Sequence, residues 1–304
     1  MSKYFCVLFT ILCLVSQSQA FEVHGHRGAR DKFPENTLSG FHYAIESGSD
    51  FIEIDIQLTR DEELVIYHDF WVNKDLCIRP DEFKSKYRFS IPYISYIDLA
   101  DLKTLDCGKK VNSKFPFQRS VPGQMVPTVE ELLDMINSME TPSAEKVAIN
   151  VEFKIPIIVS DSKLEIFLKK LVKIMDDKGF SKRFFIQSFD EDFLDLVLER
   201  YPDISVYQLV RSLDKGDIED AAERGFTGVN PYYSSVKVQD MIFAKQNGIE
   251  VIPWTVNDKD EWEHLILMGA EGVITDRPGE LRKFYNSFYM QNLLFLQGFF
   301  APLF

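Results

Sequence analysis

The sequence predicts an α/β fold: a (β/α)8 TIM barrel with an added β-hairpin arm and an insertion after that arm. Short apolar runs alternate with helical patterns from Phe21 to Arg282, and glycines end several of the helical stretches. Such repeated βα units imply a parallel sheet covered by helices. The number of runs then decides between a barrel and a doubly wound sheet, which is the alternative.

Nine apolar runs have the length and composition of β-strands. They span residues 22–28, 50–58, 63–69, 147–154, 183–189, 204–210, 228–230, 249–256 and 272–276. Only a few residues, around Arg60–Glu62, separate the second run from the third, whereas a parallel crossover needs about a dozen or more. These two runs must therefore form an antiparallel hairpin, which leaves eight parallel strands for a barrel.

Helical patterns fill most of the intervals between the strands. They span residues 37–47, 128–138, 164–177, 190–200, 218–224, 237–247 and 259–268. Asn36 precedes the first of them as a capping residue. Four of the helical stretches end at a glycine, namely Gly48, Gly225, Gly248 and Gly269. Glycine is favoured there because the residue after a helix commonly adopts a left-handed conformation.

The first 20 residues predict a cleaved secretory signal peptide. Lys3 supplies positive charge, an apolar run extends from Tyr4 to Val15, and small residues precede a cleavage site after Ala20. About a dozen apolar residues cannot span a bilayer, which disfavours a membrane anchor. We therefore expect a secreted or periplasmic protein whose folded domain spans residues 21–283.

An insertion of about residues 70–125 follows the hairpin. It shows no clear βα unit and is rich in Pro, Asp, Lys and aromatic residues. Once the signal peptide is removed, Cys77 and Cys107 are the cysteines that remain, and both lie in this insertion. Two cysteines in an exported chain suggest one disulfide bond. Two buried free thiols are the alternative.

The last segment, residues 284–304, is a hydrophobic C-terminal tail dense in Phe and Leu. Gln291, Asn292, Gln297 and Gly298 interrupt it, which makes it a poor transmembrane span. We favour an extension packed on the body of the domain. The alternative is an interfacial anchor that gives the protein peripheral contact with a membrane.

The charge balance limits the partners of this chain. Its 304 residues include 34 Lys and Arg against 47 Asp and Glu, a net charge of −13. Nonspecific binding to nucleic acid or to an anionic membrane requires a basic face, so no nucleic-acid partner is predicted. A phosphate site is compatible with this balance only if local cations or a metal supply the positive charge.

Polar residues concentrate at the carboxyl ends of the predicted strands, where barrel active sites lie. Glu53 and Asp55 are two positions apart on one strand, so both carboxylates point to the same face, and Glu152 and Lys154 repeat this spacing on the next barrel strand. Three converging carboxylates would repel one another unless they bound a divalent cation. All-oxygen ligands fit Mg²⁺ or Ca²⁺, while a salt-bridged barrel interior is the alternative.

Two of the five histidines, His26 and His68, follow strands near those carboxylates. Two histidines that face each other across a metal-bound phosphate can act as general base and general acid. Arg27 and Lys154 supply the local positive charge that a phosphate site in this acidic chain requires.

In their order and spacing, these residues and their neighbours resemble the glycerophosphodiester phosphodiesterase family. The resemblance extends from His24 to about Gly279. The motifs that carry it are His26-Arg27-Gly28-Ala29, Pro34-Glu35-Asn36-Thr37, Glu53-x-Asp55, His68-Asp69, Asn150-Val151-Glu152-Phe153-Lys154, Ser188-Phe189, Trp254-Thr255-Val256-Asn257 and Ile274-Thr275-Asp276-Arg277-Pro278.

The resemblance implies a TIM barrel that hydrolyses glycerophosphodiesters to glycerol 3-phosphate and an alcohol. The roles it implies are one divalent metal on Glu53, Asp55 and Glu152, an acid–base pair of His26 and His68, a phosphate held by Arg27 and Lys154, and a pocket wall at Trp254. One departure concerns the hairpin turn, where Asp61-Glu62 replaces the family's usual Gly. This departure affects the expected turn shape rather than the chemistry.

Two other functions are compatible with the same residues. The first is a phospholipase D-type activity on lysophospholipid or sphingomyelin, in which the aromatic insertion and the Phe-rich tail would contact lipid. The second is a catalytically inactive barrel that serves as an exported binding module. The intact histidines and carboxylates argue against the second function.

Overall fold

The computed structural model describes residues 21–300 except for residue 90 and residues 156–159, and for residues 161 and 291–300 it describes the backbone alone. The predicted signal peptide, residues 1–20, lies outside the described residues.

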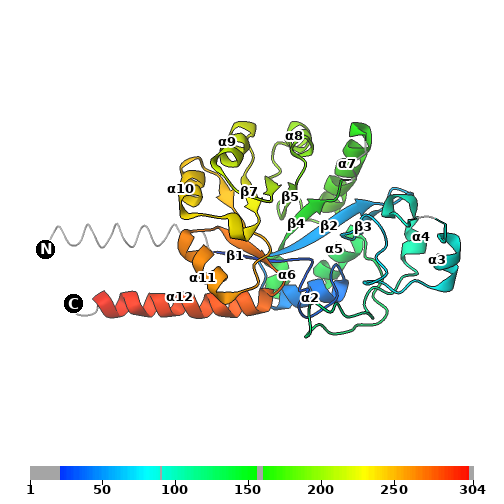
Figure 1. Ribbon diagram of the computed structural model, residues 1–304, viewed down its shortest axis with the longest axis horizontal. Helices are drawn as coiled ribbons and strands as arrows, with labels where there is room; N and C mark the ends of the chain where they lie inside the picture. The colour runs from blue at the N-terminus through cyan, green and yellow to red at the C-terminus, as the bar shows by residue number, and fades with distance from the viewer. Residues whose placement is uncertain (1–20, 90, 156–159, 301–304) are drawn as a thin grey trace.

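Eight parallel strands form the barrel that the sequence predicts (Figure 1). Backbone hydrogen bonds join the last strand of the sheet order to the segment that follows the first, from the Ile274 amide to the Pro253 carbonyl (2.9 Å) and from the Val256 amide to the Ile274 carbonyl (2.9 Å). This closure rules out the doubly wound sheet. The strand order is β8 (Glu250–Val251), β7 (Gly228–Pro231), β6 (Val206–Val210), β5 (Phe184–Ser188), β4 (Ala148–Phe153), β2 (Phe51–Leu58), β1 (Glu22–Gly25) and β9 (Gly272–Thr275).

The ninth strand, β3 (Leu64–Ile66), pairs antiparallel with β2 as the short connection predicts. Its register places Leu58 opposite Leu64. The turn closes with a hydrogen bond from the Thr59 amide to the Glu63 carbonyl (3.0 Å), and Glu62 has a φ of 61°. The turn shape is therefore kept without glycine, at a conformational cost of roughly 1–2 kcal/mol.

The seven predicted helices are all present, with small changes at their ends. α9 begins at Lys215 rather than at residue 218 because the Asp214 carboxylate caps the amides of Gly216 and Asp217. Short elements that the sequence pattern did not predict are α3 (Asp81–Lys86), α4 (Leu99–Leu102), α6 (Pro142–Lys146) and two 3-10 turns. The seven are α2 (Leu38–Glu46), α5 (Val129–Ser138), α7 (Asp161–Asp177), α8 (Glu191–Arg200), α9 (Lys215–Arg224), α10 (Val238–Gln246) and α11 (Lys259–Met268).

The insertion has a small hydrophobic core of its own, separate from the main core between the strands and the helices. Phe83, Ile94 and Leu102 are buried in it together with both cysteines. Cys77 and Cys107 form a disulfide bond, as predicted, which excludes the free thiols. Residues without strand or helix periodicity therefore fold around a covalent link beside the carboxyl ends of the barrel.

The described part of the C-terminal tail, residues 284–300, lies within a long helix, α12 (Pro278–Phe300), which begins before residue 284, and residues 301–304 lie outside the described residues. Phe284 and Tyr285 pack against the main core, whereas Tyr289 and Met290 are about half exposed. In Figure 1, α12 extends beyond the body at the end of the molecule opposite α3 and α4. The prediction that the tail packs on the body of the domain is therefore confirmed for its first turns. Within the described residues, no helix is long and apolar enough to cross a membrane.

Loss of the disulfide is expected to destabilise the chain. The bond closes a loop with a sequence separation of 30, for which the chain-entropy model gives a contribution of about 3.5 kcal/mol. The double variant Cys77→Ala/Cys107→Ala should therefore unfold at a lower urea concentration, as monitored by circular dichroism. Reductant should lower the midpoint of the parent protein and leave that of the variant unchanged. Equal midpoints for the parent and the variant would contradict this prediction.

Candidate active site

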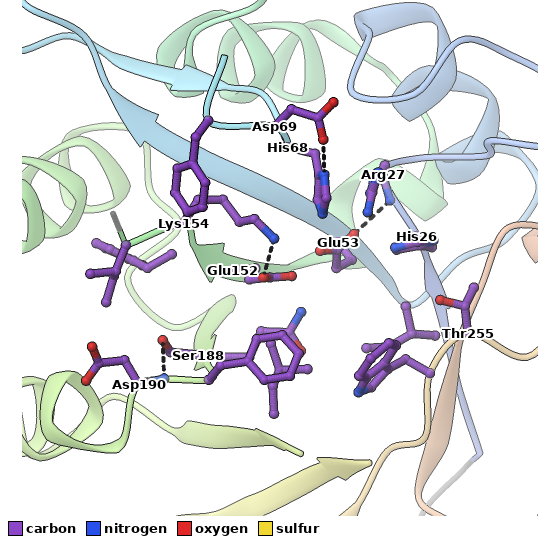
Figure 2. A pocket seen from close by; sticks show the side chains of 18 of the residues that line it. His26, Arg27, Glu53, His68, Asp69, Glu152, Lys154, Ser188, Asp190 and Thr255 are labelled. Carbon is purple, nitrogen blue, oxygen red and sulfur yellow. Dashed lines mark hydrogen bonds and ion pairs between the residues drawn. The ribbon is translucent and has the colours of Figure 1, made fainter. Parts of the chain in front are cut away.

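A pocket of about 890 Å³ opens at the carboxyl ends of the barrel strands (Figure 2). Of the eight residues predicted to act there, all except Asp55 line it. Asp55 is fully buried beneath the pocket floor and reaches the site through its contacts with other floor residues. The lining combines these ionic side chains with the aromatic side chains of Phe189 and Trp254.

Three carboxylates meet on the floor, as the strand spacing predicts. β2 and β4 are neighbours, with Asp55 directly opposite Glu152. One carboxylate oxygen from each of Glu53, Asp55 and Glu152 lies within 4.8 Å of the others. Glu53 Oε1 and Asp55 Oδ1 are buried without a hydrogen-bond partner. Buried acceptors left in this state are costly, so this set of oxygens fits a cation with oxygen ligands.

The pKa values of the three carboxyls also show that burying them side by side is unfavourable. Burial, followed by repulsion from Asp55 and Glu152, raises the pKa of Glu53 well above its usual value. Burial also raises the pKa of Glu152. Burial works against the charge of Asp55 too, but Arg27 and other cations outweigh it and lower the pKa of that carboxyl. Ionisation of all three carboxyls together is therefore unfavourable unless further positive charge is supplied.

Arg27 organises this floor through its backbone and its side chain. It has a φ of 50°, which turns its amide toward Glu53 Oε2 at 2.8 Å. Its guanidinium pairs with Glu35 (2.7 Å) and with Asp55 (3.2 Å). The following Gly28 has a φ of 91°, and a Cβ there would lie 2.8 Å from the backbone of α2. The His-Arg-Gly turn thus needs glycine for both conformation and space.

Asn36 has a role that the capping signal did not predict. The N-cap of α2 is Thr37, whose hydroxyl accepts a hydrogen bond from the Gly40 amide (3.2 Å). Asn36 itself has a φ of 53° and donates from its amide nitrogen to Asp55 Oδ2 at 2.8 Å. The interpretation of Asn36 as a cap was therefore wrong, and its side chain instead stabilises the ionised form of Asp55.

His26 contacts a carboxylate that lies 250 residues away in the sequence. Its Nδ1 is 2.7 Å from Asp276 Oδ1, and Asp276 is also held by Asn257 (2.7 Å) and Arg30 (2.9 Å). Burial opposes the charge of Asp276, but His26 and Arg30 outweigh it and lower the pKa of this carboxyl. Because an ionised carboxylate only accepts hydrogen bonds, Nδ1 carries the proton of His26.

Burial, with Arg27 and Arg30 nearby, lowers the pKa of His26 to about 4 despite the attraction of Asp276. The imidazole is therefore neutral at neutral pH, and its Nε2 lone pair is available. His68 lies in a more open setting, with a side chain 30% exposed against 13% for His26. Its Nδ1 is 2.7 Å from Asp69 Oδ1, and Asn73 donates to the other oxygen of Asp69 at 2.8 Å.

Lys154 lies against the carboxylates of the floor. Its Nζ is 2.6 Å from Glu152 and 3.5 Å from Asp55, as Figure 2 shows for the first contact. Burial opposes its charge, but these two carboxylates outweigh it and raise the pKa of Lys154. Trp254 also lines the pocket, and its indole is fixed by donating to the Asn230 carbonyl at 2.7 Å. The Phe189 ring packs edge-on against this indole at 5.8 Å.

Four residues of the site received no predicted role: Arg30, Glu35, Asp69 and Asp276. Glu35, Asp69 and Asp276 stand inside the motifs quoted above, without a role of their own. These three carboxylates contact Arg27, His68 and His26 respectively. Arg30 contacts two of them, Glu35 and Asp276. The signal in the sequence that could have indicated their roles is the presence of charged residues at predicted strand ends and turns.

Comparison with known proteins agrees with this geometry. The model of the glycerophosphoryl diester phosphodiesterase family matches residues 26–280. The chain belongs to this family. The resemblance and the expected class of enzyme, a phosphodiester hydrolase, are thereby confirmed.

Relatives and solved structures match over most of their length. A glycerophosphodiester phosphodiesterase of Caldanaerobacter subterraneus subsp. tengcongensis is 29% identical over 85% of this chain and 95% of its own. The human lysophospholipase D GDPD1 is 23% identical over 86% of this chain and 85% of its own. The structure of a phosphodiesterase of Oleispira antarctica in complex with the product sn-glycerol-3-phosphate matches with a TM-score of 0.72 and 22% identity. The match covers 87% of this chain and 96% of that protein. This last similarity supports the fold.

The low pKa of His26 predicts a specific dependence of stability on pH. Between pH 4 and the ordinary histidine pKa of 6.5, the unfolded chain binds a proton at residue 26 that the folded chain does not. The stability contributed by neutral His26 is therefore present above pH 6.5 and lost as the pH falls toward 4. His26→Gln should reduce the slope of unfolding free energy against pH in this window by up to roughly 1.4 kcal/mol per pH unit.

The measurement is urea unfolding at several pH values in the presence of a chelator. His264→Gln, on the exposed face of α11, is the control for the replacement of a histidine as such. An unchanged slope in His26→Gln would contradict the prediction.

Proposed function

We propose that this chain hydrolyses glycerophosphodiesters to glycerol 3-phosphate and an alcohol, with one divalent cation held by Glu53, Asp55 and Glu152. The observation that carries the proposal is the buried carboxylate cluster with unpartnered oxygens, placed in a pocket that His26 and His68 also line. Family membership and the product bound by the Oleispira antarctica protein support the same substrate class.

The cation is Mg²⁺ or Ca²⁺, since all three ligands offer oxygen. When bound, it would neutralise the phosphodiester and stabilise the charge that develops on the phosphate oxygens. Arg27 and Lys154 extend this positive region into the pocket. Both are already paired with carboxylates of the floor, so they would bind the phosphate as members of an ionic network whose excess negative charge the cation would offset.

The two histidines suit opposite roles. His26 is buried and neutral, and its proton lies on Nδ1 toward Asp276, so Nε2 can accept a proton from the nucleophile. The nucleophile is either the neighbouring glycerol hydroxyl or water. His68 is more exposed and is oriented by Asp69, so it would protonate the leaving alcohol. Trp254 would pack against the organic part of the substrate from the aromatic wall.

A phospholipase D-type activity on lysophospholipid is the second candidate. The similarity to the human lysophospholipase D and the exposed aromatic residues of the insertion, such as Trp71 and Tyr93, favour it. Hydrolysis rates on glycerophosphocholine and on lysophosphatidylcholine, measured side by side, distinguish the two substrates. A faster reaction with the lysolipid would favour the second candidate.

We also propose that the protein is exported. The apolar run at residues 4–15 and the small residues before the cleavage site are typical of a signal peptide. The Cys77–Cys107 disulfide is compatible with an oxidising compartment. Sequencing the N-terminus of the protein recovered outside the cytosol would test cleavage after Ala20.

Removal of either histidine should abolish most of the activity. His26→Ala and His68→Ala should each lower kcat on glycerophosphocholine by on the order of 10²–10⁴, because each removes one proton transfer. His264→Ala, on an exposed helix face, is the matched control and should retain the parent rate. Near-normal turnover in both single variants would contradict the proposed acid–base pair.

Binding of the cation should be visible without any assay of activity. Millimolar Mg²⁺ or Ca²⁺ should raise the melting temperature of the chelator-treated protein by several degrees, since the ion binds the folded state and relieves carboxylate repulsion. Glu53→Gln removes one ligand charge and one source of repulsion. We expect this variant to melt at or above the ion-free parent and to lose the rise caused by the ion. An equal rise in both proteins would contradict the assignment.

A further inference from the structure

Exposed aromatic side chains gather at one end of this molecule. Among the residues that the structure describes, eight aromatic side chains are exposed by a third or more. Seven of them belong to the insertion or to loops beside the pocket, and one lies on α12. The seven are Trp71, Phe89, Tyr93, Tyr96, Phe117, Phe189 and Tyr232, and the other is Tyr289. Exposed aliphatic residues also occur on the outer helices, where Ile166, Ile242 and Leu267 lie on three different helices.

Three of these side chains, Trp71, Tyr93 and Tyr96, are in contact with one another in series, and with Phe89 and Ile91, which lie close by in the sequence, they make up what we call the aromatic rim. Trp71 and Tyr93 form an antiparallel bridge, and their rings meet edge to face at 6.3 Å. The rings of Tyr93 and Tyr96 meet in the same way at 6.0 Å. Phe89 is 89% exposed and Tyr96 is 67% exposed. A contiguous exposed apolar surface of this kind marks an interaction site.

The charges beside the aromatic rim are balanced. Lys84 pairs with Asp81 at 2.9 Å, and Lys86 pairs with Asp101 at 2.5 Å. The Arg88 guanidinium lies over the Phe89 ring at 4.2 Å. The whole chain carries a net charge of −13, which repels an anionic surface. A partner with both charges and no net charge is therefore the complement of this region. The open aromatic faces also suit a quaternary ammonium group.

We propose that the aromatic rim docks the mouth of the pocket on the surface of a zwitterionic, phosphocholine-rich lipid bilayer. Trp71 belongs to both the rim and the pocket lining, so the docked surface would adjoin the pocket opening. Trp and Tyr side chains favour the headgroup level of a bilayer, where an apolar ring and a polar end are both accommodated. This binding does not depend on the proposed hydrolysis. It is also distinct from anchoring by the tail, because α12 extends from the opposite end of the molecule (Figure 1).

The test is co-sedimentation of the full chain with phosphatidylcholine vesicles. The triple variant Phe89→Ser/Ile91→Ser/Tyr96→Ser removes apolar surface from the rim and leaves the pocket lining unchanged. Its partition coefficient should fall by about tenfold or more, because apolar burial drives this binding. The control Ile166→Ser/Ile242→Ser/Leu267→Ser removes exposed aliphatic side chains from the outer helices and should bind like the parent. Both variants should hydrolyse soluble glycerophosphocholine at the parent rate.

Binding to phosphatidylcholine should also be nearly independent of salt, since it does not rest on net charge. Equal partition of the parent and the rim variant would overturn the proposal and would point to the tail. Binding only to vesicles with anionic lipid, or binding abolished by salt, would overturn it as well. Light scattering in the absence of vesicles provides a further check. If the parent forms a dimer that the rim variant has lost, the proposal would also be overturned. A loss of turnover with vesicle binding intact would count against the proposed function and not against the rim.

Discussion

The burial of three carboxylates side by side is the constraint on which the rest of this structure depends. Glu53 and Asp55 share a face of β2, and β4 places Glu152 beside them under the pocket. Such a cluster is unfavourable in a folded chain unless its charge is neutralised. The backbone amide and guanidinium of Arg27, together with the ammonium of Lys154, offset part of it. The oxygens left without partners give the cluster its capacity for a cation.

The same ionic network makes the two histidines unequal. His26 shares its surroundings with Arg27 and Arg30, so a positive charge on its ring is disfavoured even beside Asp276. His68 stands at the open side of the pocket, with Asp69 as its partner. The proposed division of roles, with His26 as the base and His68 as the acid, rests on this difference in burial and neighbouring charge.

The mouth of the barrel is built from two sources. The barrel strands and their loops provide the ionic floor and the Trp254 wall, while the insertion provides the outer aromatic surface. The insertion is held by a second core, which it shares with Val65 and Tyr67 of the hairpin arm, and by the Cys77–Cys107 disulfide.

The sequence by itself determined the barrel and the floor of the site. Strand alternation and the short turn at Arg60–Glu62 are local properties, and they sufficed for eight parallel strands, the hairpin arm and the shared face of Glu53 and Asp55. Only the tertiary structure decided the pairing of His26 with Asp276 and the contact of Asn36 with Asp55. These hydrogen bonds join residues on different elements, and their geometry exists only once the barrel closes and the Arg27 turn adopts its positive φ. A pattern read along one chain segment carries no information about such distances.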